Sequence, residues 1–222
     1  MVSDPVDPAS YPLAWDESYS KKGPQWRGGL NLSKYLEMLD LSGAVIEMGA
    51  GNGNAAGKLA NAMPAGSRLV CFDVSKKALM QFSQRLRNDG RVFSAVADAR
   101  ATPFREGSFN SVLVRHVLTH AIPGDESRIL SEVRRLLSKN GRALVEVFTP
   151  EDMRHGKGRD LAPGVFLHGG GLVWRFFSEG DIREAVAKAG LEILELDVVS
   201  RHVTFRGKRY LRESIVAIVS RE

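Results

Sequence analysis

The sequence has little of what would tie it to disulfides, thiolate metal sites or a membrane. Its 222 residues include a single cysteine, Cys71, which excludes an internal disulfide and any metal site built from several thiolates. No run of residues approaches the roughly 20 apolar positions that a membrane-spanning helix needs. The start, MVSDPVDPAS, carries acids and prolines and is unlike a secretory signal peptide. We therefore expect a cytoplasmic protein that does not act in a membrane.

The composition indicates a globular chain with a basic surface. Hydrophobic residues make up 43% of the sequence and charged residues 26%, which fits a domain with a sizeable core. The formal net charge of +5 is compatible with an anionic ligand or with nucleic acid. Residues 1–29 are rich in proline, serine and aromatic residues and predict an irregular arm or cap, with a helical turn near 14–19. Residues 30–222 are expected to form one domain.

Short β-rich segments alternate with helical ones through most of the chain. The expected strands are 44–48, 68–72, 92–97, 111–115 and 142–148, and the expected helices are 30–39, 54–62, 76–88, 125–138 and 179–189. This alternation predicts an α/β fold with a doubly wound, mostly parallel sheet. Two further β-rich runs, 192–204 and 214–219, have no helix between them and predict a C-terminal antiparallel hairpin.

One stretch, VIEMGAGNGNAAGKLA, places three glycines at alternate positions directly after an expected strand. Bare backbone at this point allows a sharp turn and a close approach of amides to a ligand. A tight turn without a ligand is the alternative, although one glycine would be enough for it. The spacing departs from the G-x-G-x-x-G of nicotinamide-dinucleotide sites. Glu47, two residues before the first glycine, would repel a pyrophosphate and attract a cationic ligand.

Two more acids close the next two expected strands. Asp73 follows RLVCF, where its two oxygens could accept both hydroxyls of a ribose. Asp98 lies in AVADARATPF, where it could accept a hydrogen bond from an adenine amine. A turn or helix-capping role is the alternative for a single acid at such a position. Because ligands of doubly wound sheets bind at the carboxyl ends of the strands, three acids at three such ends predict a binding site.

These motifs resemble those of the class I, Rossmann-like, S-adenosylmethionine-dependent methyltransferases. The resemblance rests on E-x-G-x-G-x-G, the acid closing the second strand, and D-A-R-x-x-P-F before SFNSVLVRHVL, and it covers residues 30–150. Within this family, the sequence most resembles the broad methyltransferase-domain group. It implies a seven-stranded, mostly parallel sheet with a C-terminal antiparallel hairpin, and S-adenosyl-L-methionine as the cofactor.

The same resemblance implies a role for each matching residue. The implied cofactor-binding residues are Glu47, Gly49, Gly51 and Gly53 beside the methionine, Asp73 at the ribose, Val74, Asp98 and Ala99 at the adenine, and Arg115 near the sulfonium. The family often places an aromatic or basic N-terminal residue over the methionine carboxylate. The candidates for that position are Tyr19, Trp26 and Arg27.

Methyl transfer needs a positioned nucleophile and, for some acceptors, a base that removes a proton. His116 and His120 in VRHVLTHA are the catalytic candidates, because His116 directly follows an expected strand at the floor of the site. The alternative for each is a packed or capping histidine.

The acceptor should be recognised outside the core motifs. The connection 149–179 is longer than usual, mixes glycine, basic and aromatic residues, and is expected to fold over the site as a lid. The stretch RHVTFRGKRYLRE is basic until its final acid, so it is either a solvated turn or a clamp for carboxylate, phosphate or nucleic-acid backbone. The substrate candidates are Arg154, His155, Arg175, Arg206 and Arg209.

The sequence thus predicts methyl transfer to a small metabolite, anionic ones included. RNA, either tRNA or rRNA, is the alternative acceptor, and a cofactor-binding regulatory module without turnover is the second alternative. The N/D-P-P-Y/F run of amino-group base methylases is missing after the fourth strand, and Cys71 lies inside an expected buried strand, which argues against cytosine C5 chemistry. No acid cluster indicates a metal. The acceptor atom and the oligomeric state are left open.

Overall fold

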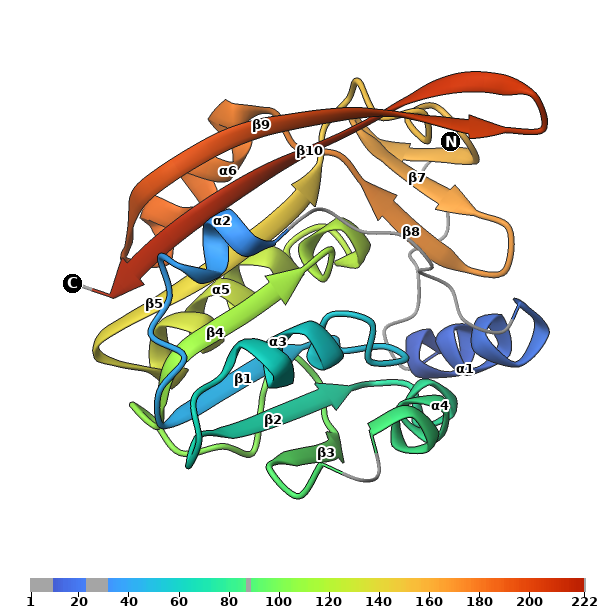
Figure 1. Ribbon diagram of the computed structural model, residues 1–222. Helices are drawn as coiled ribbons and strands as arrows, with labels where there is room; N and C mark the ends of the chain where they lie inside the picture. Colours follow the sequence, from blue (N-terminus) through green and yellow to red (C-terminus); the bar gives the residue numbers. More distant parts are fainter. Residues whose placement is uncertain (1–9, 23–31, 87–88, 222) are drawn as a thin grey trace.

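A seven-stranded sheet forms the centre of the structure, a computed structural model that describes residues 10–22, 32–86 and 89–221 (Figure 1). The strand order is β3-β2-β1-β4-β5-β10-β9, with parallel pairing from β3 to β5 and antiparallel pairing of β10 with both of its neighbours. The strands are β1 (Ala44–Met48), β2 (Arg68–Asp73), β3 (Val92–Val96), β4 (Phe109–Arg115), β5 (Leu137–Phe148), β9 (Leu191–Phe205) and β10 (Lys208–Arg221). The predicted doubly wound, mostly parallel sheet with its C-terminal hairpin is confirmed.

Helices cover both faces of this sheet. They are α1 (Tyr11–Lys22), α2 (Ser33–Leu36), α3 (Ala56–Ala62), α4 (Lys76–Leu86), the 3-10 turn η1 (Leu118–His120), α5 (Asp125–Leu136) and α6 (Glu179–Lys188). Side chains of α3 and α4 pack in one apolar cluster on one face, while those of α5 and α6 pack in another on the opposite face. The described helices include none that is long and apolar enough to cross a membrane.

Alternation along the strands fills both clusters. In β1, Val45 belongs to the cluster with α3 and α4, and Ile46 belongs to the cluster with α5 and α6. In β4, Leu113 likewise belongs to the cluster with α3 and α4, and Val114 to the cluster with α5 and α6. All four side chains are fully buried. Successive side chains of a strand point to opposite faces, so a strand covered on both sides reads as a continuous apolar run. This is why AVIEM and SVLVR were recognisable as strands.

The chain between β5 and α6, which we predicted as a lid-like connection, folds into a small sheet of its own. Its strands are β6 (Arg159–Ala162), β7 (Val165–His168) and β8 (Leu172–Arg175), paired antiparallel in that order. β8 lies against η1 and α1. The insertion is tied to the main sheet at both ends, by Met153 N donating to Leu211 O and by Phe177 N donating to Phe148 O. Whether it acts as a lid stays a prediction.

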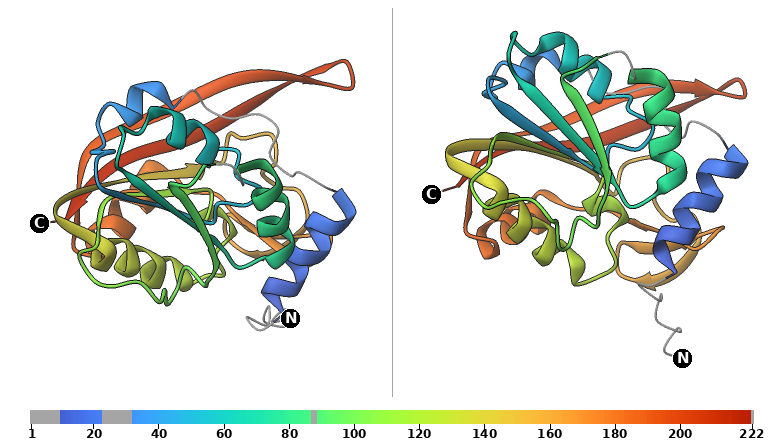
Figure 2. Two further views of the ribbon diagram at one scale, coloured as in Figure 1. Left: turned by 60° about the horizontal axis from the view of Figure 1, so that its bottom comes forward. Right: turned by 90° about the horizontal axis from the view of Figure 1, so that it is seen from below.

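Several predicted boundaries need correction. The arm was expected to be irregular, but α1 is a helix of 12 residues, and Figure 2 shows it beside α4. The helix expected over 125–138 ends at Leu136, where the chain enters β5. The strand expected over 111–115 begins earlier, at Phe109. The expected boundary of arm and domain at residue 29 lies outside the described residues.

The C-terminal hairpin is longer than the two β-rich runs predicted. Instead of a basic connection, β9 and β10 continue to a turn at Arg206 and Gly207, whose φ values of 49° and 75° fit a two-residue hairpin turn. β5 pairs with β10 only from Ser214 onward, so residues 201–212 form a two-stranded arm that we call the basic ribbon. The ribbon projects beyond the sheet on the side where β1 and β4 end (Figures 1 and 2).

Candidate active site

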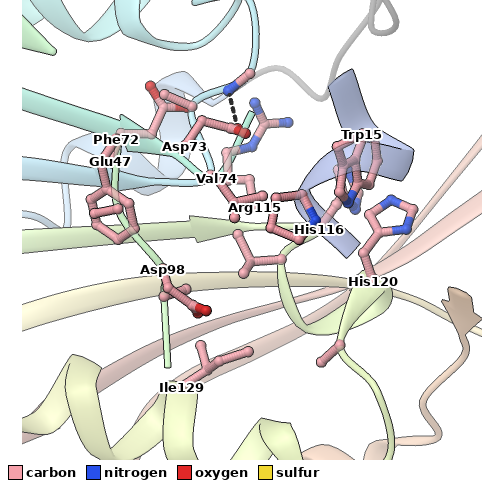
Figure 3. A pocket seen from close by; sticks show the side chains of 18 of the residues that line it. Trp15, Glu47, Phe72, Asp73, Val74, Asp98, Arg115, His116, His120 and Ile129 are labelled. Atoms are coloured by element: carbon pink, nitrogen blue, oxygen red, sulfur yellow. Dashed lines mark hydrogen bonds between the residues drawn. The ribbon is translucent and has the colours of Figure 1, made fainter. Parts of the chain in front are cut away.

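A cavity lies at the carboxyl ends of β1, β2 and β4, beneath α1 (Figure 3). The empty space between its lining residues, open mouth included, is about 1160 Å³. The residues expected to bind cofactor or act in catalysis that line it are Glu47, Gly49, Gly51, Asp73, Val74, Asp98, Ala99, Arg115, His116 and His120. The fold therefore gathers into one space residues that are up to 73 positions apart in the chain.

The glycine loop follows β1 in a left-handed path. Gly49, Gly51 and Gly53 have φ values of 65°, 54° and 79°, which side-chain-bearing residues rarely adopt. A Cβ on Gly51 would lie 2.5 Å from the hydroxyl oxygen of Tyr19, and one on Gly53 would lie 2.7 Å from the Phe82 ring. Gly51 thus underlies the cavity. Gly53 packs against α4 and does not line the cavity, and its expected role at the cofactor stays a prediction.

Asp73 fixes this loop. One of its carboxylate oxygens accepts a hydrogen bond from the Gly51 amide at 2.8 Å, drawn as the dashed line in Figure 3, and the other accepts one from the Ser75 amide at 2.8 Å. Burial raises the pKa of Asp73 to about 6, against the lowering effect of these amides. Each carboxylate oxygen has two lone pairs, so acceptor capacity remains for two ligand hydroxyls.

Glu47 is the second buried acid of the cavity. Only 3% of the surface of this residue is exposed to solvent. Burial raises the pKa of Glu47 to about 7, with Arg115 opposing the rise and Asp73 adding to it. Two neighbouring carboxylates with raised pKa values make a site that favours a positively charged ligand group.

Apolar side chains also line the cavity. Ile129 lies near Asp98, and Val74 directly follows Asp73 (Figure 3). Asp98 is paired with Arg100, with 2.6 Å between Nη2 and the carboxylate, and Arg100 also reaches Asp125 on α5. Burial acts to raise the pKa of Asp98, but Arg100 holds it below its usual value, so this acid is charged at neutral pH.

α1 forms a wall of the cavity, and of the aromatic residues on this wall the sequence interpretation had named only Tyr19. Tyr11, Trp15 and Tyr19 line it, spaced four residues apart on one helix face. That aromatic spacing was visible in the sequence and is typical of a helix that packs against something. Asp16 anchors α1 to the start of α4 by accepting hydrogen bonds from the Ser75 hydroxyl and the Lys77 amide. Trp26 and Arg27, the other two candidates from the arm, lie outside the described residues.

His116 and His120 stand at the end of β4, toward the insertion. His116 lies 3.3 Å from Glu146 through Nε2, and Arg115 donates to the same carboxylate at 2.7 Å. His120 is held by the Val173 carbonyl oxygen of β8, 2.9 Å from its Nδ1, and by the edge of the Trp15 ring. Burial lowers the pKa of His120 to about 3, so it stays neutral. Glu146 was not among our predicted residues.

The five expected substrate residues lie outside the cavity lining. Arg154 pairs with Asp152 and stacks over Phe148, with 4.2 Å from its guanidinium carbon to the ring centre. Arg175 pairs with Glu126 of α5 at 2.6 Å. The remaining three are His155, which packs edge-on against two phenylalanine rings of the insertion, and Arg206 and Arg209 on the basic ribbon. Their roles as substrate contacts stay predictions.

Comparisons with known proteins agree with this geometry. A family model described as a methyltransferase domain matches residues 46–145. The chain is 29% identical over 174 residues to the tRNA N(3)-cytidine methyltransferase METTL2 of Xenopus tropicalis, covering 74% of this chain and 52% of that protein. It is 28% identical over 163 residues to the malonyl-[acyl-carrier protein] O-methyltransferase of Geobacter sulfurreducens, covering 71% and 60%. The chain thus spans between half and two thirds of these relatives.

A solved structure shares the fold across nearly all of the chain. The 1,6-didemethyltoxoflavin-N1-methyltransferase of Burkholderia thailandensis, solved with 1,6-didemethyltoxoflavin and S-adenosylhomocysteine, superposes with a TM-score of 0.71 at 21% identity, covering 98% of this chain and 94% of that one. Strand order, motif order and the match of a methyltransferase-domain model to residues 46–145 together support a class I, Rossmann-like, S-adenosylmethionine-dependent methyltransferase.

The residues of the cavity fit this cofactor. S-adenosylmethionine carries a sulfonium and an ammonium group, and Glu47 and Asp73 supply the negative charge that such groups require. The two arginines of the lining, Arg100 and Arg115, are each paired with a carboxylate and so do not repel a cation. Val74 and Ile129 offer apolar surface to a planar base.

The geometry of the glycine loop predicts that alanine substitutions at two glycines have very different effects on cofactor binding. We expect Gly51→Ala to abolish S-adenosylmethionine binding, because its Cβ meets Tyr19 and its φ of 54° is strained by at least about 1 kcal/mol for alanine. Gly57→Ala is the matched control, since a Cβ there finds only Leu86 at 3.8 Å. Calorimetry with both variants measures the difference. Adding Tyr19→Phe to Gly51→Ala should restore part of the affinity, and undiminished affinity in Gly51→Ala itself would refute the assignment.

The raised pKa of Glu47 predicts that the stability of the free protein and its affinity for the cofactor both depend on pH. Its raised pKa of about 7 means that the unfolded chain ionises first as pH rises, so the free protein loses stability through the window from about 4.5 to about 7. Binding of the cationic cofactor should strengthen as Glu47 ionises, by about tenfold between about pH 6 and about pH 8. Titration calorimetry across this range measures it. The control is Glu47→Gln, which should bind weakly with a flat profile, whereas equal pH profiles for both proteins would contradict the prediction.

Proposed function

We propose that this protein transfers the methyl group of S-adenosylmethionine to a small acceptor by in-line displacement. The observation that carries the proposal is the meeting of Glu47, Asp73 and Asp98 in a cavity whose far end holds His116 and His120. The bound cofactor supplies a methyl group on an already activated leaving group. The chain then has to hold the donor, place the acceptor atom about 3 Å from the methyl carbon and exclude water.

We assign the donor contacts to the acids and the loop. Glu47 binds the ammonium group, and the Gly49 to Gly51 backbone lies beneath the methionine. Asp73 accepts from the ribose hydroxyls while it keeps the Gly51 amide. Asp98 accepts from the adenine amine, beside the apolar side chain of Val74. Tyr19, of the three arm candidates, is the one we place over the methionine end.

The acceptor end favours a small molecule. It lies under α1, through Tyr11 and Trp15, and next to β8, through the contact of His120 with Val173. A compact acceptor fits beneath this cover, while a polymer would have to insert a single flipped group. We keep the cytoplasm as the proposed location of the reaction.

A methyl-acceptance screen tests the function. The protein is incubated with tritiated S-adenosylmethionine and separate pools of metabolites, acidic and neutral, and of tRNA, and transferred label is counted. We expect label in a metabolite pool and its loss in Asp73→Ala, because losing a charge-assisted contact weakens cofactor binding by about 1.5–3 kcal/mol. Glu195→Gln, a substitution on the far strand β9, is the matched control and should retain activity. Cofactor binding without label in any pool would favour the regulatory module.

RNA is the second candidate acceptor, and the basic ribbon is the observation that favours it. Arg201, Arg206, Lys208 and Arg209 are exposed on an arm that has no third strand and no acid between residues 201 and 212. Exposed positive charges of this kind suit contact with a phosphate backbone. The ribbon also lies on the side of the sheet where β1 and β4 end (Figure 1), and tRNA is the substrate named for METTL2.

Salt dependence separates the two acceptors. If RNA is the acceptor, its affinity should fall steeply with salt, and Arg206→Ala combined with Arg209→Ala should reduce the log–log slope by about 2. Arg68→Ala, at the opposite edge of the sheet where β2 begins, is the control and should leave the slope unchanged. Fluorescence titration with a tRNA transcript measures this. An unchanged slope in the double variant would remove the ribbon from RNA binding and leave the small molecule.

A further inference from the structure

A buried acid joins the insertion to the base of the basic ribbon. The side chain of Asp152 is fully buried. Its Oδ1 accepts hydrogen bonds from the Arg154 amide at 3.1 Å and from Arg154 Nη1 at 3.3 Å. Its Oδ2 accepts from Arg212 Nε at 2.9 Å and from the Glu213 amide at 3.2 Å. These four donors use the acceptor capacity of the carboxylate.

Two guanidinium groups therefore share one carboxylate. The side chains of Arg154 and Arg212 are 12% and 19% exposed, so both are largely withdrawn from water. Both also face the Phe148 ring, with 4.2 Å and 5.6 Å from their guanidinium carbons to its centre. An aromatic ring attracts a cation, but far less strongly than a second carboxylate would. The two arginines thus carry more positive charge than Asp152 neutralises.

A third arginine adds like charge on the same face of the ribbon. Arg201 is exposed and lies directly opposite Arg212 in the pairing of β9 with β10. Directly opposed side chains of an antiparallel pair share one face, where like charges are destabilising. Burial lowers the pKa of Arg154 to about 9, and Asp152 opposes this lowering. Arg212 and Arg201 add to it, so the three arginines, which we call the arginine cluster, lie within electrostatic reach of one another.

The neighbouring charges do not offset those of the cluster. Glu213 follows Arg212 in an extended strand, so its side chain faces the other way, where it accepts from the Thr149 hydroxyl at 2.8 Å. Lys157 of the insertion lies over the ring of Tyr210, 5.9 Å from its centre. Tyr210 is two positions before Arg212 and shares its face of the ribbon. Lys157 therefore adds to the positive charge on this face.

We propose that the arginine cluster is a binding site for an oxyanion, either a carboxylate or a phosphate group. Arg212 is its main contact, because Nε is held by Asp152 while the two terminal nitrogens make no hydrogen bond to a described residue. A guanidinium fixed in this way presents its remaining N–H groups as a planar fork that matches two oxygen atoms. Arg201 supplies a second cation from the facing strand, and a bound oxyanion would relieve the repulsion between the two.

The cluster is separated from the cavity by one aromatic side chain. The Phe148 ring beside these arginines also packs against the His116 ring, with 4.2 Å between the ring centres. His116 lines the cavity, whereas the three arginines lie outside its lining. The oxyanion is therefore either a separate ion, such as inorganic phosphate, or the anionic group of an acceptor that extends beyond the cavity. The second source rests on the proposed methyl transfer and deepens it, while the site itself does not depend on it.

Nitrogen-15 NMR of arginine side chains tests the site without any acceptor. Full-length protein labelled at arginine is titrated with inorganic phosphate, and separately with acetate, at constant ionic strength. We expect the Nε resonance of Arg212, assigned by its loss in Arg212→Gln, to shift saturably with at least one of these probes. The exposed Arg183 of α6 is the internal control and should not respond. No shift at Arg212, or equal linear shifts at both arginines, would overturn the proposal.

A second variant keeps this test valid if Arg212→Gln does not fold. Arg201→Gln leaves both arginine contacts of Asp152 in place. It should raise the dissociation constant of the bound probe by about two- to fivefold, the range of an exposed charge pair. Arg183→Gln should leave that constant unchanged. Equal dissociation constants in the wild type and in Arg201→Gln would remove Arg201 from the site and contradict the proposal.

Kinetics identify the source of the oxyanion once the methyl-acceptance screen has given an acceptor. If the acceptor carries it, label enters the acidic pool, and Arg212→Gln raises the acceptor's KM by about tenfold or more while S-adenosylhomocysteine affinity stays within about twofold. An uncharged amide analogue of that acceptor should have the same KM in both proteins, which a purely structural role of Arg212 would not produce. An unchanged KM together with phosphate binding would assign the site to a separate ion.

Two further outcomes separate this proposal from the proposed function. The absence of any acceptor would refute methyl transfer alone, because the NMR titration does not depend on it. A tRNA acceptor whose affinity depends on Arg212, in a protein that binds neither phosphate nor acetate, would refute the oxyanion site and favour a nucleic-acid surface.

Discussion

Two carboxylates buried next to each other at the ends of β1 and β2 set the properties of the cavity. Glu47 and Asp73 are 3% and 8% exposed, and burial raises the pKa of each toward neutrality. Removing two acids from water is unfavourable unless hydrogen bonds or a cation compensate. Asp73 obtains two backbone amides, one of them from Gly51, whereas Glu47 is compensated only in part by Arg115. A cationic cofactor supplies what this pair lacks.

The residues near the catalytic candidates lie along the same edge of the sheet as Glu47 and Asp73. β4 lies beside β1 and β5 beside β4, so Arg115 and Glu146 follow Glu47 in space although they are far along the chain. The strained turn at His116 links the donor cavity to the insertion, whose strand β8 accepts from His120. Neighbouring strand ends thus supply the donor site and the catalytic candidates. Two further segments, α1 and the β6–β8 sheet, cover them.

Most of the fold was predictable because its determinants are local. β1 has the bounds expected from AVIEM, and the glycines that follow it are legible because few other residue types tolerate their positive φ values. The parts that were missed depend on distant contacts. The three strands of the insertion are each four residues long, too short to show a period, and α1 is ordered by packing against α4 and β8.

Glu146 shows the same limit at the level of a single residue. In ALVEVF it is an acid inside an apolar strand, which signals that something must neutralise it, but its partners Arg115 and His116 are about 30 positions earlier. Only the parallel pairing of β4 with β5 identifies them. Likewise the basic substrate candidates were named from the sequence, and only the fold shows that they do not line the cavity.

A crystal structure of the protein with S-adenosylhomocysteine tests the central claim most directly, because the claim is that the Glu47 and Asp73 pair holds this cofactor. We expect the ligand's amino group within hydrogen-bond distance of the Glu47 carboxylate and both ribose hydroxyls on Asp73, which keeps the Gly51 amide. We expect the sulfur to face His116. A ligand bound elsewhere, or one that leaves the two acids without contact, would contradict the account.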